Sequence, residues 1–103
     1  MQPMPGWLRD ETGARTPVRP EGTLVGSSST CNVFVEDVGL PPRHALFLPT
    51  PSGTELVVID GDTPTINGEP ASLRQLLADG DVIVIAGRKL VHEWTRDAAR
   101  SGP

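Results

Sequence analysis

The sequence has little of what a disulfide, a metal site or a redox centre requires. Its 103 residues include one cysteine, Cys31, and two histidines, His44 and His92. One cysteine cannot close an intramolecular disulfide, and these three side chains do not supply the four ligands of a structural zinc site. We therefore expect no metal and no cofactor. Cys31 has no cation near it in the sequence, and we interpret it as a partly buried thiol with no reactive role.

Positive charge and long apolar runs are also scarce. Nine Lys and Arg stand against 13 Asp and Glu, which gives a formal net charge of −4 and leaves no basic stripe. Because nucleic-acid binding depends on cations set against phosphates, this balance argues against a DNA or RNA partner. No segment approaches the roughly 20 apolar residues that cross a bilayer, and the first 13 residues lack the pattern of a signal peptide. We expect no membrane insertion and a cytoplasmic location.

Turn residues dominate the chain instead. Eleven glycines and eleven prolines are spread singly between short apolar runs, which is typical of strands joined by tight turns. The Asn67-Gly68 pair is a strong hairpin signal. Only residues 71–77 have a helical pattern, with Ser72 as a candidate N-cap, so we predict one short helical turn inside a loop.

The sequence therefore predicts an all-β fold. Nine strands are expected, at residues 7–10, 15–18, 23–26, 32–35, 45–49, 55–60, 64–66, 81–86 and 89–93. About nine short strands in roughly 90 residues suit a sandwich of two sheets. We predict one domain over residues 7–96, between a flexible N-terminus at 1–6 and a flexible tail at 97–103.

Several motifs occur in an order that resembles the forkhead-associated (FHA) domain family. Val25-Gly26-Ser27 stands where the family has Ile-Gly-Arg, and His44-Ala45 matches the end of its Ser-Arg-x-His-Ala loop. Ile66-Asn67-Gly68 is similar to the family's Val-Asn-Gly turn, and residues 77–85 are similar to its Leu-x-Asp-Gly-Asp-x-Ile-x-Ile strand. The resemblance covers about residues 7–93. It implies an eleven-stranded β-sandwich that reads phosphothreonine in partner proteins.

The departures from the family fall on the residues that would hold phosphate. The arginine position is Ser27, and the serine position is Pro41, which has no side-chain donor and no backbone N–H. The segment between Asp60 and Asn67 is about three residues shorter than in the family. Donors that remain in these loops are Ser28, Thr30, Arg43 and Thr63. For His44, Asn67 and Gly68 the resemblance implies a role in supporting the loops and no contact with ligand.

Several strands are apolar on both faces, and this is the feature to which we give most weight. If Val25, Phe47 and Leu56 face the core, the alternate residues point outward on one sheet. These outward residues are Leu24, Phe34, Leu46, Leu48, Val57 and Ile59. Such a patch, on the order of 300 to 600 Å², matches or exceeds the largest patch of a typical monomer. Two alternatives stay open: a bulge could shift the alternation, or a terminal segment could fold over the sheet.

No catalytic or metal-binding pattern competes with this interpretation. Residues 27–30 with His44 lack the Gly-x-Ser-x-Gly turn of a hydrolase. Residues 60–64 resemble the start of a calcium loop, but Pro64 and Ala71 stand where ligands are needed. The sequence predicts a protein that is not an enzyme.

The sequence favours a degenerate FHA-type scaffold or assembly subunit that binds protein largely without phosphate through the outer sheet face. Its partner would be a second copy, giving a homodimer, or a different subunit. The alternative is a signalling module that reads phosphothreonine through Arg43 and residues 27–30. The composition is compatible with a bacterial source.

Overall fold

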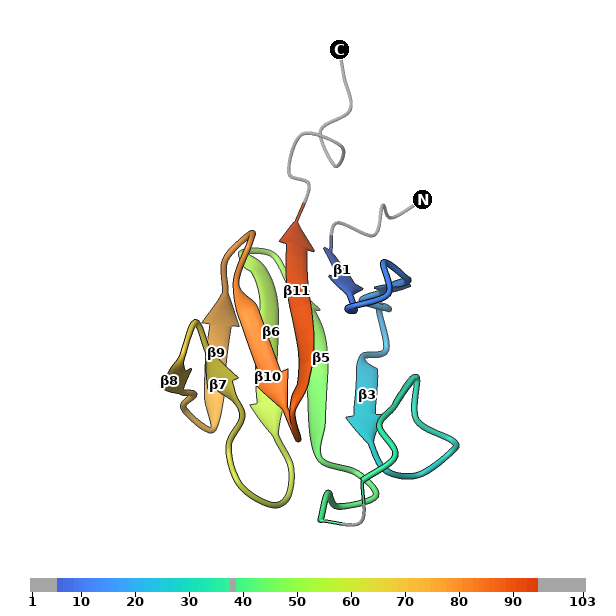
Figure 1. Cartoon of the computed structure of the whole chain (residues 1–103). Helices are drawn as coiled ribbons and strands as arrows, with labels where there is room; N and C mark the ends of the chain where they lie inside the picture. The colour runs from blue at the N-terminus through green and yellow to red at the C-terminus, as the bar shows by residue number, and fades with distance from the viewer. Residues whose placement is uncertain (1–5, 38, 95–103) are drawn as a thin grey trace.

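The computed structural model describes residues 6–37 and 39–94 and shows a sandwich of two β-sheets (Figure 1). Within these residues there are eleven strands and no helix. The strands are β1 (Gly6–Arg9), β2 (Arg15–Pro17), β3 (Thr23–Gly26), β4 (Val33–Phe34), β5 (Ala45–Thr50), β6 (Gly53–Val58), β7 (Thr65–Ile66), β8 (Glu69–Pro70), β9 (Arg74–Leu77), β10 (Val82–Ile85) and β11 (Arg88–Trp94). The all-β prediction and the two-sheet sandwich are confirmed.

The two sheets differ in size and in the part of the chain that they use. A six-stranded sheet has the order β2-β1-β11-β10-β7-β8, and a five-stranded sheet has the order β4-β3-β5-β6-β9. Every pairing is antiparallel except that of β3 with β4, which is parallel. The Asn67-Gly68 hairpin joins β7 to β8 with positive φ at both residues, as its sequence predicts.

The core lies between the sheets and is made largely of alternate residues from the longer strands. Phe47 and Leu56 of the five-stranded sheet are fully buried, as are Ile83 and Ile85 of the six-stranded sheet. Burying one such side chain stabilises the fold by about 1.5 to 3 kcal/mol. Because the residues between them point outward, the strands that are apolar at both positions also place aliphatic side chains on the outer faces.

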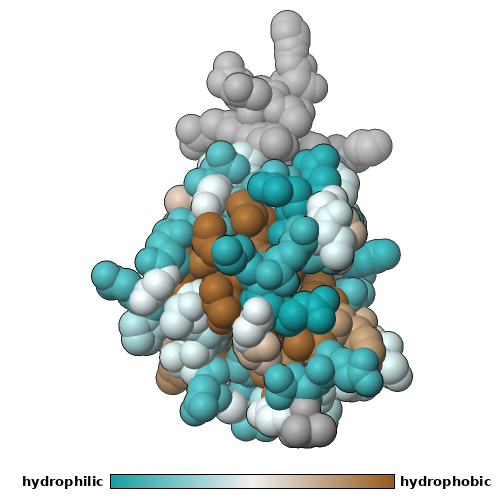
Figure 2. All heavy atoms as spheres, in the orientation of Figure 1, coloured by the Kyte–Doolittle hydropathy of each residue, from teal (hydrophilic) through white to brown (hydrophobic). Residues whose placement is uncertain are grey.

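The outer face of the six-stranded sheet is the one seen in Figure 2. Apolar surface over β10 and β11 is broken there by hydrophilic side chains. Val82 and Val91 pair across the two strands, and both are half-buried. Nearby, Glu93 forms ion pairs with Arg9 and Arg15 at 3.1 Å each. This face is therefore a mixed polar and apolar surface.

The predicted helical turn at residues 71–77 is wrong. Residues 74–77 form β9, which pairs with β6 from Thr54↔Leu77 to Val57↔Arg74. Leu77 is buried, whereas its neighbour Leu76 points outward because side chains alternate along a strand; Leu73 precedes β9 and is exposed. Ser72 does not cap a helix; its backbone N–H donates to the side chain of Gln75 at 3.0 Å. The sequence prediction also missed β8.

The predicted end segments lie almost wholly outside the described residues, which exclude 1–5 and 95–103. β1 begins at Gly6, within the segment expected to be flexible. The described part of the chain contains no helix that could cross a membrane.

A buried histidine links the two sheets. His92 on β11 has no exposed surface, and its Nδ1–H donates to the carbonyl oxygen of Ala78 at 2.9 Å. Its Nε2 then accepts from the hydroxyl of Thr54 on β6 at 2.8 Å. Because buried polar groups are costly without partners, this pair fixes how β6 and β11 face each other.

Removing the Thr54 hydroxyl should therefore destabilise the fold. We expect Thr54→Val to lower the free energy of unfolding by about 1 to 3 kcal/mol, because Nε2 of His92 loses its donor in the core. Urea denaturation followed by tryptophan fluorescence measures the change. Thr65→Val is the matched control, since the Thr65 side chain has no hydrogen bond among the described residues. Equal stability in the two variants would contradict this role.

Candidate functional site

Three loops gather at the end of the sandwich opposite the chain termini (Figure 1). They join β3 to β4 at residues 27–32, β4 to β5 at 35–44, and β6 to β7 at 59–64. Every residue that the sequence singled out for phosphate lies in these loops. The structure therefore brings the predicted loop residues to one end of the molecule.

Backbone hydrogen bonds hold the first loop against the second. The N–H of Ser27 donates to the carbonyl of Pro41 at 3.1 Å, and the N–H of Ser28 donates to that of Pro42 at 3.3 Å. The Cys31 thiol is buried and donates to the same Pro42 oxygen at 3.1 Å. A Cβ at Gly26 would lie 2.0 Å from this oxygen, so only glycine allows the two loops to approach this closely.

Ser27 and Pro41, which the sequence prediction puts at the family's phosphate-binding positions, both make contacts within the protein. The Ser27 hydroxyl donates to the carbonyl of Leu40 at 2.7 Å. Pro41 is half-buried, and its ring packs over Gly61, where an added Cβ would come within 2.8 Å of it. Ser27 thus offers no free donor proton, and Pro41 offers no donor at all.

Ser28 and Thr30 are bonded to each other. Their hydroxyl oxygens lie 2.8 Å apart, and the N–H of Thr30 donates to the Ser28 hydroxyl at 3.3 Å. Thr30 is exposed and Ser28 is half-buried. One of the two hydroxyl protons is committed to this contact, so the pair has one proton left for a ligand.

His44, the last residue of the β4–β5 loop, connects the β6–β7 loop to the sheet. Its side chain is 2% exposed, and its Nδ1–H donates to the carbonyl of Asp60 at 2.7 Å. Its backbone N–H donates to Val25, and its carbonyl accepts the N–H groups of Ile59 and Asp60. With these four bonds His44 holds β3, β5 and the β6–β7 loop together.

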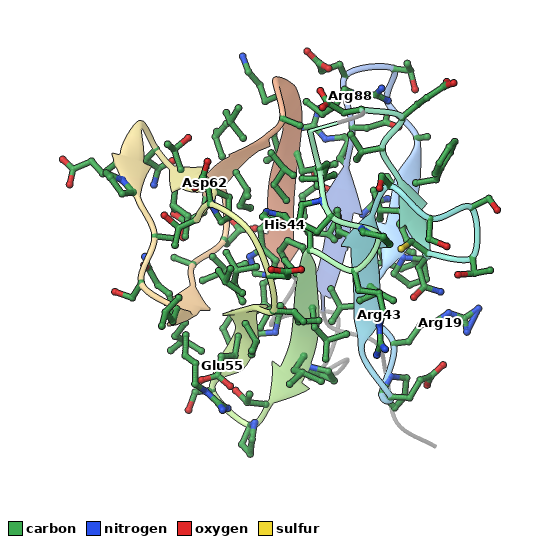
Figure 3. The ribbon with its side chains drawn as sticks, turned by 90° about the horizontal axis from the view of Figure 1, so that it is seen from below. Arg19, Arg43, His44, Glu55, Asp62 and Arg88 are labelled. Carbon is green, nitrogen blue, oxygen red and sulfur yellow. The ribbon has the colours of Figure 1, made fainter. Side chains whose placement is uncertain are left out.

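The β4–β5 and β6–β7 loops and the end of β10 border a cavity of about 280 Å³ whose lining includes two carboxylates. Its wall includes His44, Thr63 and the carboxylates of Asp37 and Asp62, and no Lys or Arg among the described residues. Arg43 is exposed and does not line this cavity. Figure 3 shows Arg43 on the same side as Arg19, with Asp62 on the other side of His44. Arg43, the cation predicted to replace the missing arginine, therefore points away from this cavity.

Asn67 and Gly68 lie away from these loops. The Asn67 side chain donates to Asp81 at 2.9 Å and accepts the N–H of Val82 at 3.0 Å. These bonds fasten the β7–β8 hairpin to the start of β10.

The predicted outward residues all lie on the five-stranded sheet or beside it. Leu24, Leu46 and Val57 form one row across β3, β5 and β6, because they pair in register. Leu48 lies opposite Glu55 in the next row. Leu24, Leu46, Leu48 and Val57 are half-buried, whereas Phe34 and Ile59 are each 46% exposed.

The sequence prediction missed the two most exposed leucines. Leu73 is 65% exposed and Leu76 is 52% exposed, both in the segment mistaken for a helical turn. Together with Phe34 and Ile59 they make up all the large exposed hydrophobic residues among those described, and each belongs to the five-stranded sheet or its adjoining loops. Reading Arg-Gln-Leu-Leu as a strand would have placed Leu76 on the outer face.

An ion pair lies at the edge of this outer face. Arg74 on β9 binds Glu55 on β6 at 2.9 Å, and this hydrogen bond raises the pKa of the guanidinium.

No group of three His, Cys, Asp or Glu that could hold a metal ion occurs within residues 6–37 and 39–94.

Known structures share this fold. The chain aligns with Mycobacterium tuberculosis EmbR in complex with a low-affinity phosphopeptide at a TM-score of 0.80 and 17% identity, over 87% of this chain and 24% of that one. It thus spans about a quarter of the EmbR chain. The N-terminal FHA domain of S. cerevisiae Rad53p, in complex with a phosphothreonine peptide, aligns at 0.76 and 18% identity over 92% and 97% of the two chains.

A third structure, the FhaA FHA domain complexed with the intracellular domain of Rv3910, aligns at a TM-score of 0.76 and 21% identity, over 85% of this chain and 99% of that one. No curated protein sequence matches the chain. The family model of the FHA domain matches residues 23–86, which span β3 to the end of β10 and include all three loops. The chain belongs to the FHA domain family, whose members are protein-interaction modules that generally bind phosphopeptides.

Proposed function

We propose that this FHA domain is a non-catalytic scaffold or assembly subunit that binds its protein partner without phosphate, through the outer face of the five-stranded sheet. The observation that carries the proposal is the loop end itself. Ser27 and Pro41, at the positions that would bind phosphate, make contacts within the protein. The cavity beside them includes the carboxylates of Asp37 and Asp62 in its lining.

The loss of phosphate contacts is large in energetic terms. A phosphothreonine dianion is best held by an arginine fork with a hydroxyl donor, and each charge-assisted hydrogen bond contributes roughly 1.5 to 3 kcal/mol. Losing two such contacts removes about 3 to 6 kcal/mol, or about two to four decades of affinity. A reader with micromolar affinity would fall to about millimolar or weaker. Repulsion from Asp62 adds to this loss.

The outer face supplies what a phosphate-independent contact needs. The half-buried row of Leu24, Leu46 and Val57 lies between the exposed side chains of Phe34 and Leu76 on opposite edge strands. Contiguous exposed apolar surface of this kind marks interaction sites in soluble proteins. The outer face of the six-stranded sheet has no large hydrophobic residue that is equally exposed among those described.

The second candidate is a phosphothreonine reader. It is favoured by the structures of EmbR and Rad53p, which hold phosphopeptides, and by the exposed guanidinium of Arg43. In this case Arg43 would have to turn toward the loop of residues 27–30 on binding.

A peptide titration separates the two candidates. We expect no phosphate-specific amide shift when ¹⁵N-labelled protein is titrated to millimolar concentration with a degenerate phosphothreonine peptide pool and its unphosphorylated twin. The variant with both Ser27→Arg and Pro41→Ser should gain phosphate-specific shifts, because it regains the guanidinium and the hydroxyl. Shifts in the unaltered protein at residues 27–30 that disappear in Arg43→Ala would establish the phosphothreonine reader instead.

Lysine substitutions test whether the outer face of the five-stranded sheet makes the partner contact. The double variant Leu46→Lys with Ile59→Lys should abolish association, because two lysines would have to be desolvated in an apolar contact. Light scattering of the chain, alone and as the complex purified from its own cells, measures the assembled mass, and circular dichroism checks the fold. Val84→Lys with Val91→Lys places the same charges on the other sheet and should leave assembly intact. Unchanged assembly in the first variant, or equal loss in the second, argues against this face.

A further inference from the structure

The open edge of β9 has backbone groups without partners in the sheet. β9 is the last strand of the five-stranded sheet and pairs only with β6. The N–H of Val58 donates to the carbonyl of Leu73 at 2.8 Å, so this pair is hydrogen-bonded. Hydrogen-bonded pairs recur at every second residue of an antiparallel ladder. Gln75 and Leu77 of β9 are therefore also in hydrogen-bonded pairs with β6. The N–H and C=O groups of the residues between them, Arg74 and Leu76, therefore point away from the sheet.

The other sheet edges are protected, whereas this one is not. β2 contains Arg15 and Pro17, β8 contains Pro70, and β4 has only two residues. Proline and charge on edge strands prevent pairing with another chain. β9 has four residues and no proline, and its one charge is neutralised by Glu55 at 2.9 Å. Leu73 and Leu76 beside this edge are 65% and 52% exposed.

The space beside the edge fits a single strand. In Figure 1, β8 lies further from the centre of the molecule than β9. A hollow of about 470 Å³ between them is lined by Ile66, Asn67, Glu69, Pro70, Gln75 and Asp81. We expect this hollow to admit the side chains of an extended segment that pairs with β9.

The charge of this hollow indicates which side chains would enter it. Its lining includes the carboxylates of Glu69 and Asp81 and no Lys or Arg. Neither carboxylate forms an ion pair with a described residue, and Asp81 also accepts hydrogen bonds from the Asn67 side chain and the N–H of Ala78. In an added strand, residues opposite Gln75 point toward the hollow, and residues opposite Arg74 and Leu76 point to the outer face. Basic residues suit the hollow, and apolar residues suit the outer face beside Leu76.

We propose that the β9 edge binds an extended segment of a partner protein, in which lysine or arginine alternates with aliphatic residues, as an added strand of the five-stranded sheet. The inference rests on the proposed function, because it gives the conformation and chemistry of the partner that reaches this sheet. Main-chain hydrogen bonds to Arg74 and Leu76 supply the affinity, and the alternation supplies the specificity.

The test uses a peptide probe and hydrogen exchange. The probe is the acetylated and amidated peptide Thr-Val-Lys-Val-Arg-Val-Thr, and its control has Glu at both basic positions. In the free protein the amides of Arg74 and Leu76 should exchange at least about tenfold faster than those of Gln75 and Leu77. The basic probe should slow their exchange by about tenfold or more, and the acidic control should bind at least about tenfold more weakly.

Two variants locate the site. Leu76→Pro removes an outward-pointing N–H together with the exposed Leu76 side chain, and proline is tolerated on edge strands where the N–H faces solvent. The variant should therefore fold and lose the protection of the Arg74 amide by the probe. Glu69→Lys is an exposed change that leaves β9 intact, and it should remove the preference between the two peptides, because the added lysine offsets the charge of Asp81. Phe34→Lys at the opposite edge of the sheet is the control and should bind the probe normally.

The outcomes separate this inference from the proposed function. Probe binding that persists in the Leu46→Lys, Ile59→Lys variant supports the edge whether or not the outer face assembles. Probe shifts centred on another edge, or none at all, overturn the inference. Protection of Arg74 and Leu76 that rises with protein concentration and without peptide would make the occupant a second copy, and it also overturns the inference.

Discussion

The loop end of this molecule depends on His44. Its ring is 2% exposed, and its bonds reach Val25 on β3, Ile59 after β6 and Asp60 in the β6–β7 loop. Unpaired polar groups at such a buried position would each cost about 1 to 3 kcal/mol, so the bonds are made together or lost together. The approach of Gly26 to Pro42 extends the same constraint to the β3–β4 loop. The loops are therefore held in place by internal contacts, and their order does not depend on a ligand.

Under the proposed function, the domain keeps its loops ordered through these internal contacts and does not use them to bind phosphate. His44 matches the resemblance and supports the loops through its hydrogen bonds. Ser27 and Pro41, by contrast, depart from the residues that the resemblance predicts for phosphate binding. Ser27 turns its hydroxyl inward to Leu40, Pro41 packs on Gly61, and Asp62 adds negative charge to the cavity wall. The proposed function rests on this composition, because carboxylates beside a site repel a dianion. The apolar surface and the open backbone edge both lie on the five-stranded sheet.

Much of the fold could be predicted from the sequence because its signals are local. Asn67-Gly68 sets a hairpin through backbone geometry, and the alternation around Phe47 sets which face is buried. Residues 71–77 were misread because leucines at positions 73, 76 and 77 fit a helical period as well as a strand. Pairing with β6 decides between the two, and this contact lies about 20 residues away in the sequence. The direction in which Arg43 points and the open edge of β9 are likewise set by tertiary contacts.

The central claim is that partner binding does not require phosphate, and phosphatase treatment tests it most directly. The chain would be purified with its partner from the cells that produce it, treated with a broad-specificity protein phosphatase, and the retained partner quantified by mass spectrometry against a mock-treated sample. This account predicts equal retention in the two samples. Release of the partner on dephosphorylation would contradict it and would return the phosphothreonine site to the loops around Arg43.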